Sequence, residues 1–475
     1  MTTVDRRKFL RDLGGAAFAP SLVGLAACTD PLADAISPAH TVVKSNIGGY
    51  GDLNVDPDCP ELLIPPGFRC VKLSETLQPS KANPNFIVPQ ALDGMAAYGM
   101  PNPDRIRLVR NHEIRDNAGI APPFGGSPYD PLAGAGTTTL EVKYVRDPNG
   151  GLTDVEVVAE WPSLTGTLVN CAGGPTPWRS WLTCEETTSG VSQGYGAAHG
   201  YVFEVPADAN RVVRPRPLKA LGRFVHEAVA VDPATGIVYL TEDRSWSAGS
   251  TNAIGSGFFR FIPRVAGLLH EGGRLQVLKI RERNNFNTVL NQTPGRILPV
   301  EWVDIDNPDP AEAETDPSAV FREGYARGAA FFQRLEGCWY GDNSIFFNAT
   351  SGGNAGLGQV WQYRPISADR GQLILVFESP DVSILDSPDN IAVSPRGGIV
   401  LCEDGGGEQY IRGLTQQGNI FDFVRTSGNL PEFAGATFDP KGEVLFFNIQ
   451  GSTSATGTEH GGTYAIWGPW DQGAL

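Results

Sequence analysis

Polar residues with oxygen or sulfur ligand atoms recur at both ends of six similar segments of this chain. Each segment opens with such a residue, continues as a short apolar stretch, turns at Pro or Gly, and closes with a second apolar stretch and an acid or amide. The opening and closing residues are Asp93 and Glu113, Cys171 and Glu186, Glu227 and Asp243, Glu336 and Asn348, Asn390 and Asp404, and Glu432 and Asn448. Because both ends of an antiparallel hairpin lie at the same edge, each copy brings its two polar residues together.

Carboxylates gathered in this way point to metal ions, since like charges within a few ångströms of one another cost free energy unless cations neutralise them. Six hairpins around one axis would collect these ligands and one thiol at a single mouth. We therefore predict a polynuclear metal site. Its predicted ligands are Cys171, Glu227, Glu336, Asp404, Glu113, Glu186, Asp243, Asn390 and Glu432.

Three copies close with two adjacent acids, which are Glu185-Glu186, Glu242-Asp243 and Glu403-Asp404. Successive side chains of a strand point to opposite faces, so only one acid of each pair can face the axis. The alternation does not decide between them. We choose the second acid of each pair as the ligand.

The elements that must position these residues are strands. A further strand that begins at glycine follows each hairpin, at residues 136–142, 200–205, 257–262, 358–363, 418–423 and 462–467. Stretches at 155–161, 275–280 and 373–377 supply a fourth strand in several units. Glycine (57) and proline (37) are abundant and methionine (3) is scarce, as suits a turn-rich all-β chain. Six units of three to four strands predict a six-bladed β-propeller.

The domain organisation follows from this repeat. Residues 1–28 are a targeting segment, residues 29–85 form an N-terminal arm, and residues 86–475 form the propeller. A longer connection at about 263–327 interrupts the repeat and contains a helix-compatible stretch from Ala319. We predict that it is an insertion capping one face.

The N-terminal segment predicts export. Arg6-Arg7 stands before a short apolar stretch, the form that the Tat exporter reads. That stretch ends in Leu25-Ala26-Ala27-Cys28, which resembles a lipobox with Cys28 as the acylated residue; a plain cleavage site is the alternative. Nothing downstream has the ~20 apolar residues of a spanning helix. We expect a periplasmic or outer-envelope protein, with a possible lipid anchor at Cys28.

Charge and the remaining cysteines add narrower constraints. The net charge of −16 argues against nucleic acid as a partner. Cys184, Cys338 and Cys402 lie in strands and are expected to behave as small buried hydrophobes. Cys59 and Cys70 flank an apolar strand, and such a pair can be oxidised in an exported protein. The sequence does not decide whether they form a disulfide.

Several segments resemble the PhoX family of secreted alkaline phosphatases. They are Asn170-CAGGPTPWRSWLTCEE, His226-EAVAVDP, Arg334-LEG, Ser387-PDN, Cys402-EDGGG and Pro431-EFAGATF. The resemblance runs from about Pro65 to Trp470 and includes the Tat signal. It implies a propeller with a cluster of Fe³⁺ and Ca²⁺ at the end of its channel, and hydrolysis of phosphate esters. Arg179 departs from the family pattern, where glycine is expected, in a turn distal to the site.

The resemblance also implies individual roles. Cys171 matches the family's iron-ligating cysteine, and a thiolate suits Fe³⁺ better than Ca²⁺. Glu227 and Glu336 match its metal-ligating glutamates. Arg334 matches its phosphate-binding arginine; it lies two residues before Glu336, on the same face of an extended strand, and can hold two phosphate oxygens. Asn111 is a candidate neutral ligand or donor to a phosphoryl oxygen, with a turn-capping role as the alternative.

Two other patterns are weaker evidence for a functional site. His112 and His226 invite a zinc interpretation, but the chain has no H-E-x-x-H motif and oxygen ligands dominate. Gly190-Val-Ser192-Gln-Gly194 fits the G-x-S-x-G nucleophile pattern, yet it lies in a glycine-rich loop with no helix after it.

The function predicted from these residues is that of a metal-dependent phosphomonoesterase acting on small phosphate esters. A calcium-dependent lactonase or arylesterase is the second interpretation, since propellers with a central Ca²⁺ also perform that chemistry. A non-catalytic, calcium-stabilised envelope binding protein is the third, because the fold alone does not decide function.

Overall fold

The computed structural model describes residues 47–475 of the protein. The predicted Tat segment, with Arg6-Arg7 and Cys28, lies outside the described residues. The described chain has twenty-six strands, one α-helix, α2 (Ala319–Ala326), and five short 3-10 helices, which confirms the all-β class. The 3-10 helices are η1 (Val191–Gln193), η2 (Lys219–Leu221), η3 (Leu269–Glu271), η4 (Ala311–Glu314) and η5 (Trp470–Gln472). No helix among residues 47–475 has the length and apolar character needed to cross a membrane.

The strands form five sheets, and all of their strand pairs are antiparallel. In chain order, the first sheet has β4 (Leu92–Gly99), β5 (Arg105–His112), β6 (Ala135–Arg146) and β7 (Leu152–Thr167). The second has β8 (Asn170–Pro175), β9 (Ser180–Glu185) and β10 (Val202–Pro206). The fifth has β24 (Phe433–Phe438), β25 (Val444–Ile449), β26 (Gly462–Trp467) and β3 (Arg69–Glu75).

Two sheets are larger. The third runs in the order β11 (His226–Val231), β12 (Val238–Glu242), β13 (Phe258–Pro263), β14 (Gly273–Ile280), β15 (Ile297–Asp304), β19 (Gly371–Glu378), β18 (Gln359–Pro365), β17 (Ser344–Ala349) and β16 (Leu335–Gly341). The fourth runs β1 (Asn54–Val55), β2 (Leu62–Ile64), β23 (Ile420–Thr426), β22 (Tyr410–Leu414), β21 (Ile399–Glu403) and β20 (Pro388–Val393).

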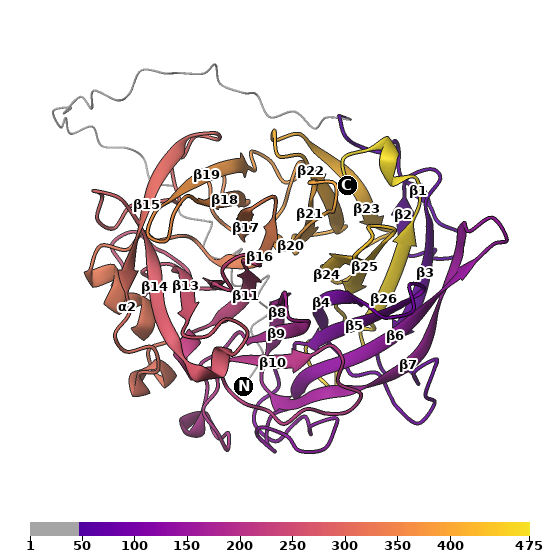
Figure 1. Ribbon diagram of the computed structural model, residues 1–475, viewed down its shortest axis with the longest axis horizontal. Helices are drawn as coiled ribbons and strands as arrows, with labels where there is room; N and C mark the ends of the chain where they lie inside the picture. Colours follow the sequence, from indigo (N-terminus) through magenta and orange to yellow (C-terminus); the bar gives the residue numbers. More distant parts are fainter. Residues whose placement is uncertain (1–46) are drawn as a thin grey trace. The chain divides into compact units, whose positions relative to one another are not determined.

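All six repeated segments form hairpins, each made of two consecutive antiparallel strands. The first strands of the hairpins touch one another in a closed cycle, β4, β8, β11, β16, β20, β24 and back to β4. Figure 1 shows these strands grouped about a common centre, with the other strands of each sheet further out. Hydrophobic side chains fill the space between neighbouring sheets; Leu182, Val229 and Phe259, from β9, β11 and β13, belong to one such cluster.

Each hairpin has a register shift near the start of its first strand. A β-bulge of this kind re-aims the side chain that it displaces. In five of the hairpins the first displaced residue is an acid or a thiol, namely Asp93, Cys171, Glu227, Glu336 and Asp389. The bulge therefore turns one ligand-type residue of each of these five hairpins out of the regular alternation of the sheet.

Glycines let the first strands approach closely at the centre. A Cβ atom at Gly94 would lie 2.7 Å from the Cα of Ala172 on the next hairpin. One at Gly337 would lie 2.7 Å from the carbonyl oxygen of Asp389. The packed axis keeps a cavity of only about 10 Å³, lined by Gly94, Ala172, Gly337 and their neighbours.

Three departures from the sequence prediction concern the edges of the sheets. Residues 54–75 lie in the predicted arm, yet β1 and β2 extend the sheet of β23, and β3 pairs with β26. The predicted insertion supplies β14 and β15, and β15 pairs with β19, which joins two groups of strands into one sheet. In the fifth unit, the predicted third strand at 418–423 is the fourth, because β22 precedes it.

Candidate metal centre

Four sets of ligand-type side chains lie where the hairpins begin and end. Within each set the ligand atoms are all within 4.8 Å of one another. The sets are Cys171, Glu186 and Glu227; Asp93, Glu113 and Glu432; Glu227, Glu336 and Asp389; and Asp389, Asp404 and Glu432. We call the eight carboxyl groups of these sets, together with Asp243, the axial acids.

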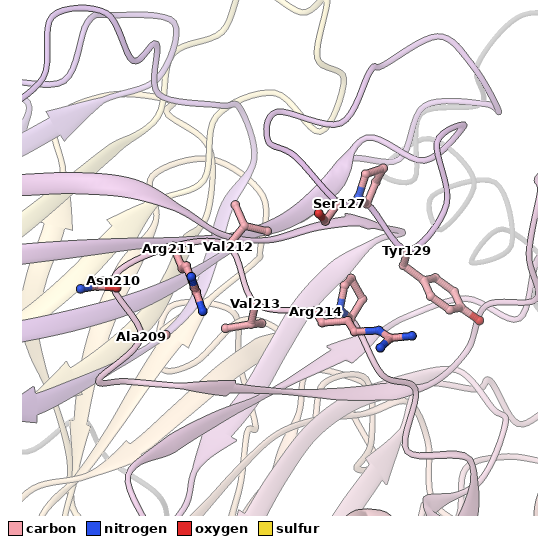
Figure 2. A pocket seen from close by; sticks show the side chains of 10 residues that line it. Ser127, Tyr129, Ala209, Asn210, Arg211, Val212, Val213 and Arg214 are labelled. Carbon is pink, nitrogen blue, oxygen red and sulfur yellow. The ribbon is translucent and has the colours of Figure 1, made fainter.

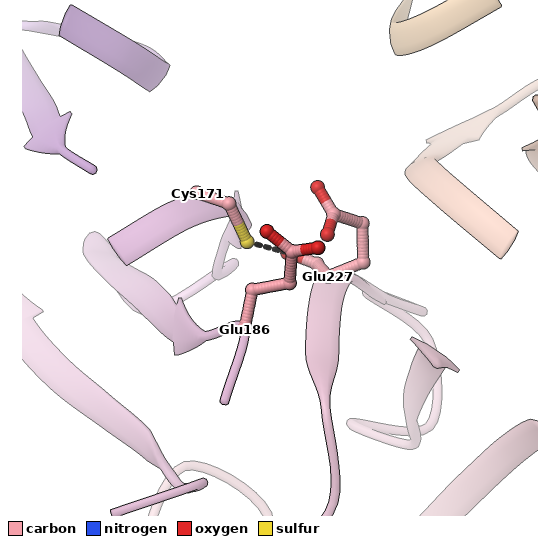
Figure 3. Close-up of side chains that lie close together, drawn as sticks. All are labelled: Cys171, Glu186 and Glu227. Carbon is pink, nitrogen blue, oxygen red and sulfur yellow. Dashed lines mark hydrogen bonds between the residues drawn. The ribbon is translucent and has the colours of Figure 1, made fainter. Parts of the chain in front are cut away.

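The set with the thiol is drawn in Figure 3. Cys171 comes from the bulge of β8, Glu186 follows β9, and Glu227 comes from the bulge of β11. The Cys171 Sγ lies 3.4 Å from the backbone carbonyl oxygens of His226 and Glu227, to which the protonated thiol donates. All three side chains are buried and point toward one another.

The structure separates the two acids of each closing pair. Glu186 and Asp404 belong to the sets, and Asp243 pairs with Arg334. The acids one residue earlier turn into the sheets: Glu185 accepts hydrogen bonds from His199 Nδ1 (2.6 Å) and the Gly200 amide (2.9 Å). Glu242 accepts from the Gly257 amide (2.8 Å), and Glu403 accepts from Arg412 Nε (2.7 Å). We call Glu185, Glu242 and Glu403 the interior acids.

Burial and mutual repulsion shift the pKa values of several axial groups. Burial raises the pKa of Asp93 well above its usual range, and Glu113 raises it further. Burial and then Glu336 raise the pKa of Glu227, and burial and then Asp404 raise that of Glu432. The Cys171 thiol is raised by burial and by Glu227. Added positive charge would oppose these shifts, since it favours the ionised form.

The donor set fits bound cations. Asp93 Oδ1 and Glu227 Oε2 are buried and have no hydrogen-bond partner among the described residues. Buried carboxylate oxygens are normally paired or coordinate a metal. Three of the sets offer only oxygen, as Ca²⁺ prefers, while the Cys171 set adds a thiolate, which suits Fe³⁺.

Arg334 lies at the edge of this centre, just before β16, with a φ of 49° instead of the extended conformation that the sequence predicted. Its guanidinium donates to both carboxylate oxygens of Asp243, from Nε (3.0 Å) and from Nη2 (2.9 Å). The same Nη2 donates to Glu336 Oε1 at 2.6 Å. Arg334 thus joins two hairpins. Its side chain is 12% exposed and therefore keeps some contact with solvent.

The sequence prediction missed Asp389 and Arg115. Asp389 takes part in two of the four sets, although the fifth repeat was assigned to begin at Asn390. The Asn390 amide donates to Asp389 Oδ1 (2.9 Å), and its Oδ1 accepts from the Gly435 amide (2.8 Å). Asn390 thus contacts the acid beside it, and its ligand role stays a prediction. The Ser387-PDN segment contained the signal, one residue out of register.

Asn111 also has a position that differs from its predicted catalytic role. It is fully buried, and its amide donates to the carbonyl oxygens of Cys171 (2.9 Å) and Ala172 (2.8 Å). Its Oδ1 accepts from Trp181 and Thr183, both at 2.8 Å. With both ends of the amide engaged, Asn111 holds the bulge that presents Cys171.

Two predicted closing residues do the same for other hairpins. Asn348 donates to the carbonyl oxygen of Asp389 (2.9 Å), and Asn448 donates to that of Asp93 (2.6 Å). The axial position two residues after Asn448 is Gln450, which donates to Glu113 Oε2 at 2.7 Å. These amides thus fix the backbone of a neighbouring hairpin's bulge.

The histidines and the serine of the two weaker patterns do not form a zinc site or a nucleophile site among the described residues. His112 bonds to the Gln90 carbonyl and to Thr138, and His226 bonds to the Gly222 carbonyl. Both rings are fully buried, and burial lowers the pKa of His226 to about 3. Ser192 lies in η1 on an exposed loop, where its backbone amide donates to Glu314 (2.7 Å). Cys59 and Cys70 are buried free thiols.

A groove of about 980 Å³ lies elsewhere on the protein and is lined by residues 127–129 and 209–215. Figure 2 shows Arg211 and Arg214 among its side chains. None of the residues that line it belongs to the four ligand sets. The groove is therefore separate from the four ligand sets.

Comparison with known proteins shows similarity to a family of alkaline phosphatases. The family model described as alkaline phosphatase PhoX matches residues 48–452. No curated protein matches the sequence. A solved structure of Pseudomonas fluorescens PhoX in complex with vanadate, a transition state analogue, is 18% identical, with a TM-score of 0.66 over 89% of this chain and 98% of that chain.

Two gluconolactonases are also similar over part of the fold. XC5397 from Xanthomonas campestris is 12% identical, with a TM-score of 0.34 over 80% of this chain and 97% of that chain. The periplasmic gluconolactonase PpgL of Pseudomonas aeruginosa is 12% identical, with a TM-score of 0.31 over 72% and 88% of the two chains.

Proposed function

Because the chain belongs to the PhoX family of alkaline phosphatases, and is therefore a phosphoric monoester hydrolase, we propose that it hydrolyses phosphate esters at a polynuclear metal site built from the axial acids and Cys171. The observation that carries this proposal is the convergence of four ligand sets at the ends of the hairpins, beside Arg334. Protein folds do not collect that many buried acids without a compensating charge.

The proposed architecture is a six-bladed propeller with its site at one end of the central channel. The closed cycle of first strands supports six units, with β15 as a bridge that merges the third and fourth blades into one sheet. The segment at 263–327 remains the proposed insertion, and residues 29–85 the proposed arm, whose strands complete the outer edges of the fifth and sixth blades.

Fe³⁺ at the Cys171 set and Ca²⁺ at the oxygen-only sets are the proposed cofactors. When bound, these ions supply Lewis acidity and neutralise the charge that develops on the phosphoryl and leaving-group oxygens. Cys171, Glu186 and Glu227 would hold the iron, and Asp93, Glu113 and Glu432 are one calcium set.

The residues of the chain then have separate tasks. The ligands fix the cations, and Asn111 and Asn390 hold the bulges that present two of those ligands. Arg334 is placed to hold two phosphoryl oxygens, because its planar fork already makes a two-pronged contact with Asp243. No side-chain nucleophile is needed in this scheme.

Metal analysis combined with activity tests the proposal. Purified mature protein should contain iron and calcium, absorb visible light through thiolate-to-iron charge transfer, and hydrolyse a chromogenic phosphate monoester. Cys171→Ser should abolish the visible band, while Cys338→Ser, a buried thiol of another strand, should keep it. An active protein that contains no iron would contradict the assignment of Cys171.

Arg334→Ala separates this proposal from a lactonase. Metals should stay bound, while kcat/KM for the phosphate ester falls about a hundredfold through loss of one charge-assisted clamp. Unchanged phosphatase kinetics in this variant, together with turnover of a lactone by the wild type, would favour the calcium-dependent lactonase.

We propose that the Tat machinery exports the protein to the periplasm or outer envelope, where a lipid at Cys28 anchors it. Replacing Arg6-Arg7 with Lys-Lys should hold precursor in the cytoplasm. Cys28→Ala should release the protein from membranes. Mass spectrometry that finds an unmodified mature N-terminus beyond Cys28 would refute the anchor without affecting the export proposal.

A further inference from the structure

Arg115 lies beside the axial acids, two residues after Glu113 at the end of the first hairpin. Its guanidinium pairs with Glu113 of its own hairpin and with Glu186, the closing acid of the second hairpin. The side chain is 33% exposed, against 4% for Glu113 and 7% for Glu186. Arg115 thus contacts two buried ligand candidates and still reaches the solvent side of the mouth.

Arg334 stands in the same relation to its surroundings. It lies two residues from Glu336 of its own hairpin and also pairs with Asp243, the closing acid of a neighbouring hairpin. In each case one arginine joins an acid of its own hairpin to the closing acid of an adjacent hairpin, the following one for Arg115 and the preceding one for Arg334. The two positions are chemically alike although they come from opposite ends of their hairpins.

Both arginines are linked to the ligand set that contains the thiol. Glu186, which Arg115 contacts, is a member of that set. Glu227 is also a member, and it shares a second set with Glu336, which Arg334 contacts. Arg115 therefore contacts a member of the Cys171 set, and Arg334 contacts an acid that shares a second set with another member.

The balance of charge explains why Arg115 should bind an anion. The axial acids outnumber these two arginines, so cations must supply most of the neutralising charge. Once cations bind Glu113 and Glu186, those carboxylates no longer need the guanidinium. Its N–H groups are then available to oxygens of a bound phosphate, which a planar fork recognises well.

We propose that Arg115 is a second phosphate-binding arginine, which holds a phosphoryl oxygen of the substrate and of the product phosphate across the Cys171 set from Arg334. This inference rests on the proposed function. It assigns to Arg115 the binding of the phosphoryl group and leaves the holding of metals to the acids.

The test uses Arg115→Gln and Arg115→Lys in the metal-loaded protein. Arg425→Gln is the matched control. Arg425 lies on β23, is 30% exposed and pairs with Glu408. In Arg115→Gln, KM for a chromogenic phosphate monoester and the inhibition constant of inorganic phosphate should both rise about tenfold, the cost of one charge-assisted hydrogen bond. Lysine should restore part of both values, and metal content should stay at the wild-type level.

A measurement on the wild type needs no variant. Inorganic phosphate should protect Arg115 and Arg334 from modification by phenylglyoxal, read by mass spectrometry, and should leave Arg425 unprotected. This readout does not depend on turnover and is available even if a variant fails to fold.

The outcomes distinguish this inference from the proposed function. Unchanged KM and phosphate inhibition in Arg115→Gln, or protection of Arg334 without Arg115, would overturn the inference alone. A gain of bound metal in Arg115→Gln with unchanged phosphate inhibition would show that Arg115 stands in for a cation, which also overturns it. A metal-loaded wild type that hydrolyses no phosphate ester would instead defeat the proposed function.

Discussion

Two rings of acids lie one residue apart at the ends of the same strands, and their surroundings differ. The interior acids receive hydrogen bonds from the protein: Glu185 from His199 and backbone amides, Glu403 from Arg412. The axial acids face one another across the hairpin ends. The acids of both rings are buried or half-buried and have a similar sequence context, so composition does not distinguish them. Glu185 and Glu403 have donating partners in the chain, and burial raises the pKa of Glu242, which has one oxygen without a partner among the described residues, to about 8. The axial acids need additional positive charge from solution.

The largest difference should appear when one acid of each ring is changed to its amide. Glu227→Gln removes an axial charge shared by two ligand sets, so metal content should fall and kcat/KM should drop by more than about a hundredfold. Glu242→Gln changes an interior acid whose pKa burial raises to about 8, so it is already neutral at pH 7. Its activity should stay within about threefold of wild type.

Metal analysis and steady-state kinetics on both variants check this comparison. Equal losses in the two variants would mean that the rings do not differ in function.

A second, smaller effect concerns metal removal and pH. In the metal-free chain, burial and neighbouring acids raise the pKa values of Asp93, Glu227 and Glu432 above those of the unfolded chain. A raised acid contributes stability below its unfolded pKa of about 4 and loses it as pH rises through the folded value. Bound cations reverse this by favouring the ionised form. Chelation should therefore lower the Tm by more at pH 9 than at pH 5.

Thermal unfolding with and without a strong chelator at both pH values measures this. Tight binding to the folded state alone gives about 4 kcal/mol at a thousandfold excess over Kd. A Tm that ignores the chelator at pH 9 would contradict a metal role for the axial acids.

The smallest of the three effects tests the backbone that aims the axial ring. Gly94→Ala puts a Cβ 2.7 Å from the Cα of Ala172, so the two hairpins must separate slightly. We expect a loss of about 1–3 kcal/mol in the free energy of unfolding. Gly406→Ala, where nothing lies within 4 Å, should cost much less. Chemical denaturation of both variants provides the comparison, and equal stabilities would show that the close approach at the axis is unimportant.

Much of this arrangement could be predicted from the sequence, because period-two alternation and Pro or Gly turns are local signals. They located all six hairpins and most of the axial acids. The bulge is not a local signal in one sequence, since an extra residue shifts which side chain faces the axis. In the fifth hairpin the first displaced residue is Asp389, one position before the predicted ligand Asn390. Asn348 and Asn448 donate to the backbone of neighbouring hairpins.

Long-range pairings were the other part that the sequence could not supply. Arg115 follows the first hairpin, between Glu113 and Asp116, and only the packing of two hairpins brings Glu186 to it. The bridge through β15 likewise depends on β19, far along the chain. Such contacts depend on the assembled fold and have no periodic pattern in either segment.

The pairing of β3 with β26 has a consequence for how the protein is made. These strands lie near opposite ends of the described chain, with Glu75 opposite Gly462 in the register. The sheet that they complete also carries Asp93's backbone partner, Asn448, on its β25 strand. A ribosome that has not yet synthesised β26 leaves β3 without its neighbour, so the last sheet closes only after nearly all of the described residues have emerged. Closing so long a loop is slow and entropically costly, so the acids of the first and sixth hairpins should meet, and gain affinity for cations, only at the end of synthesis.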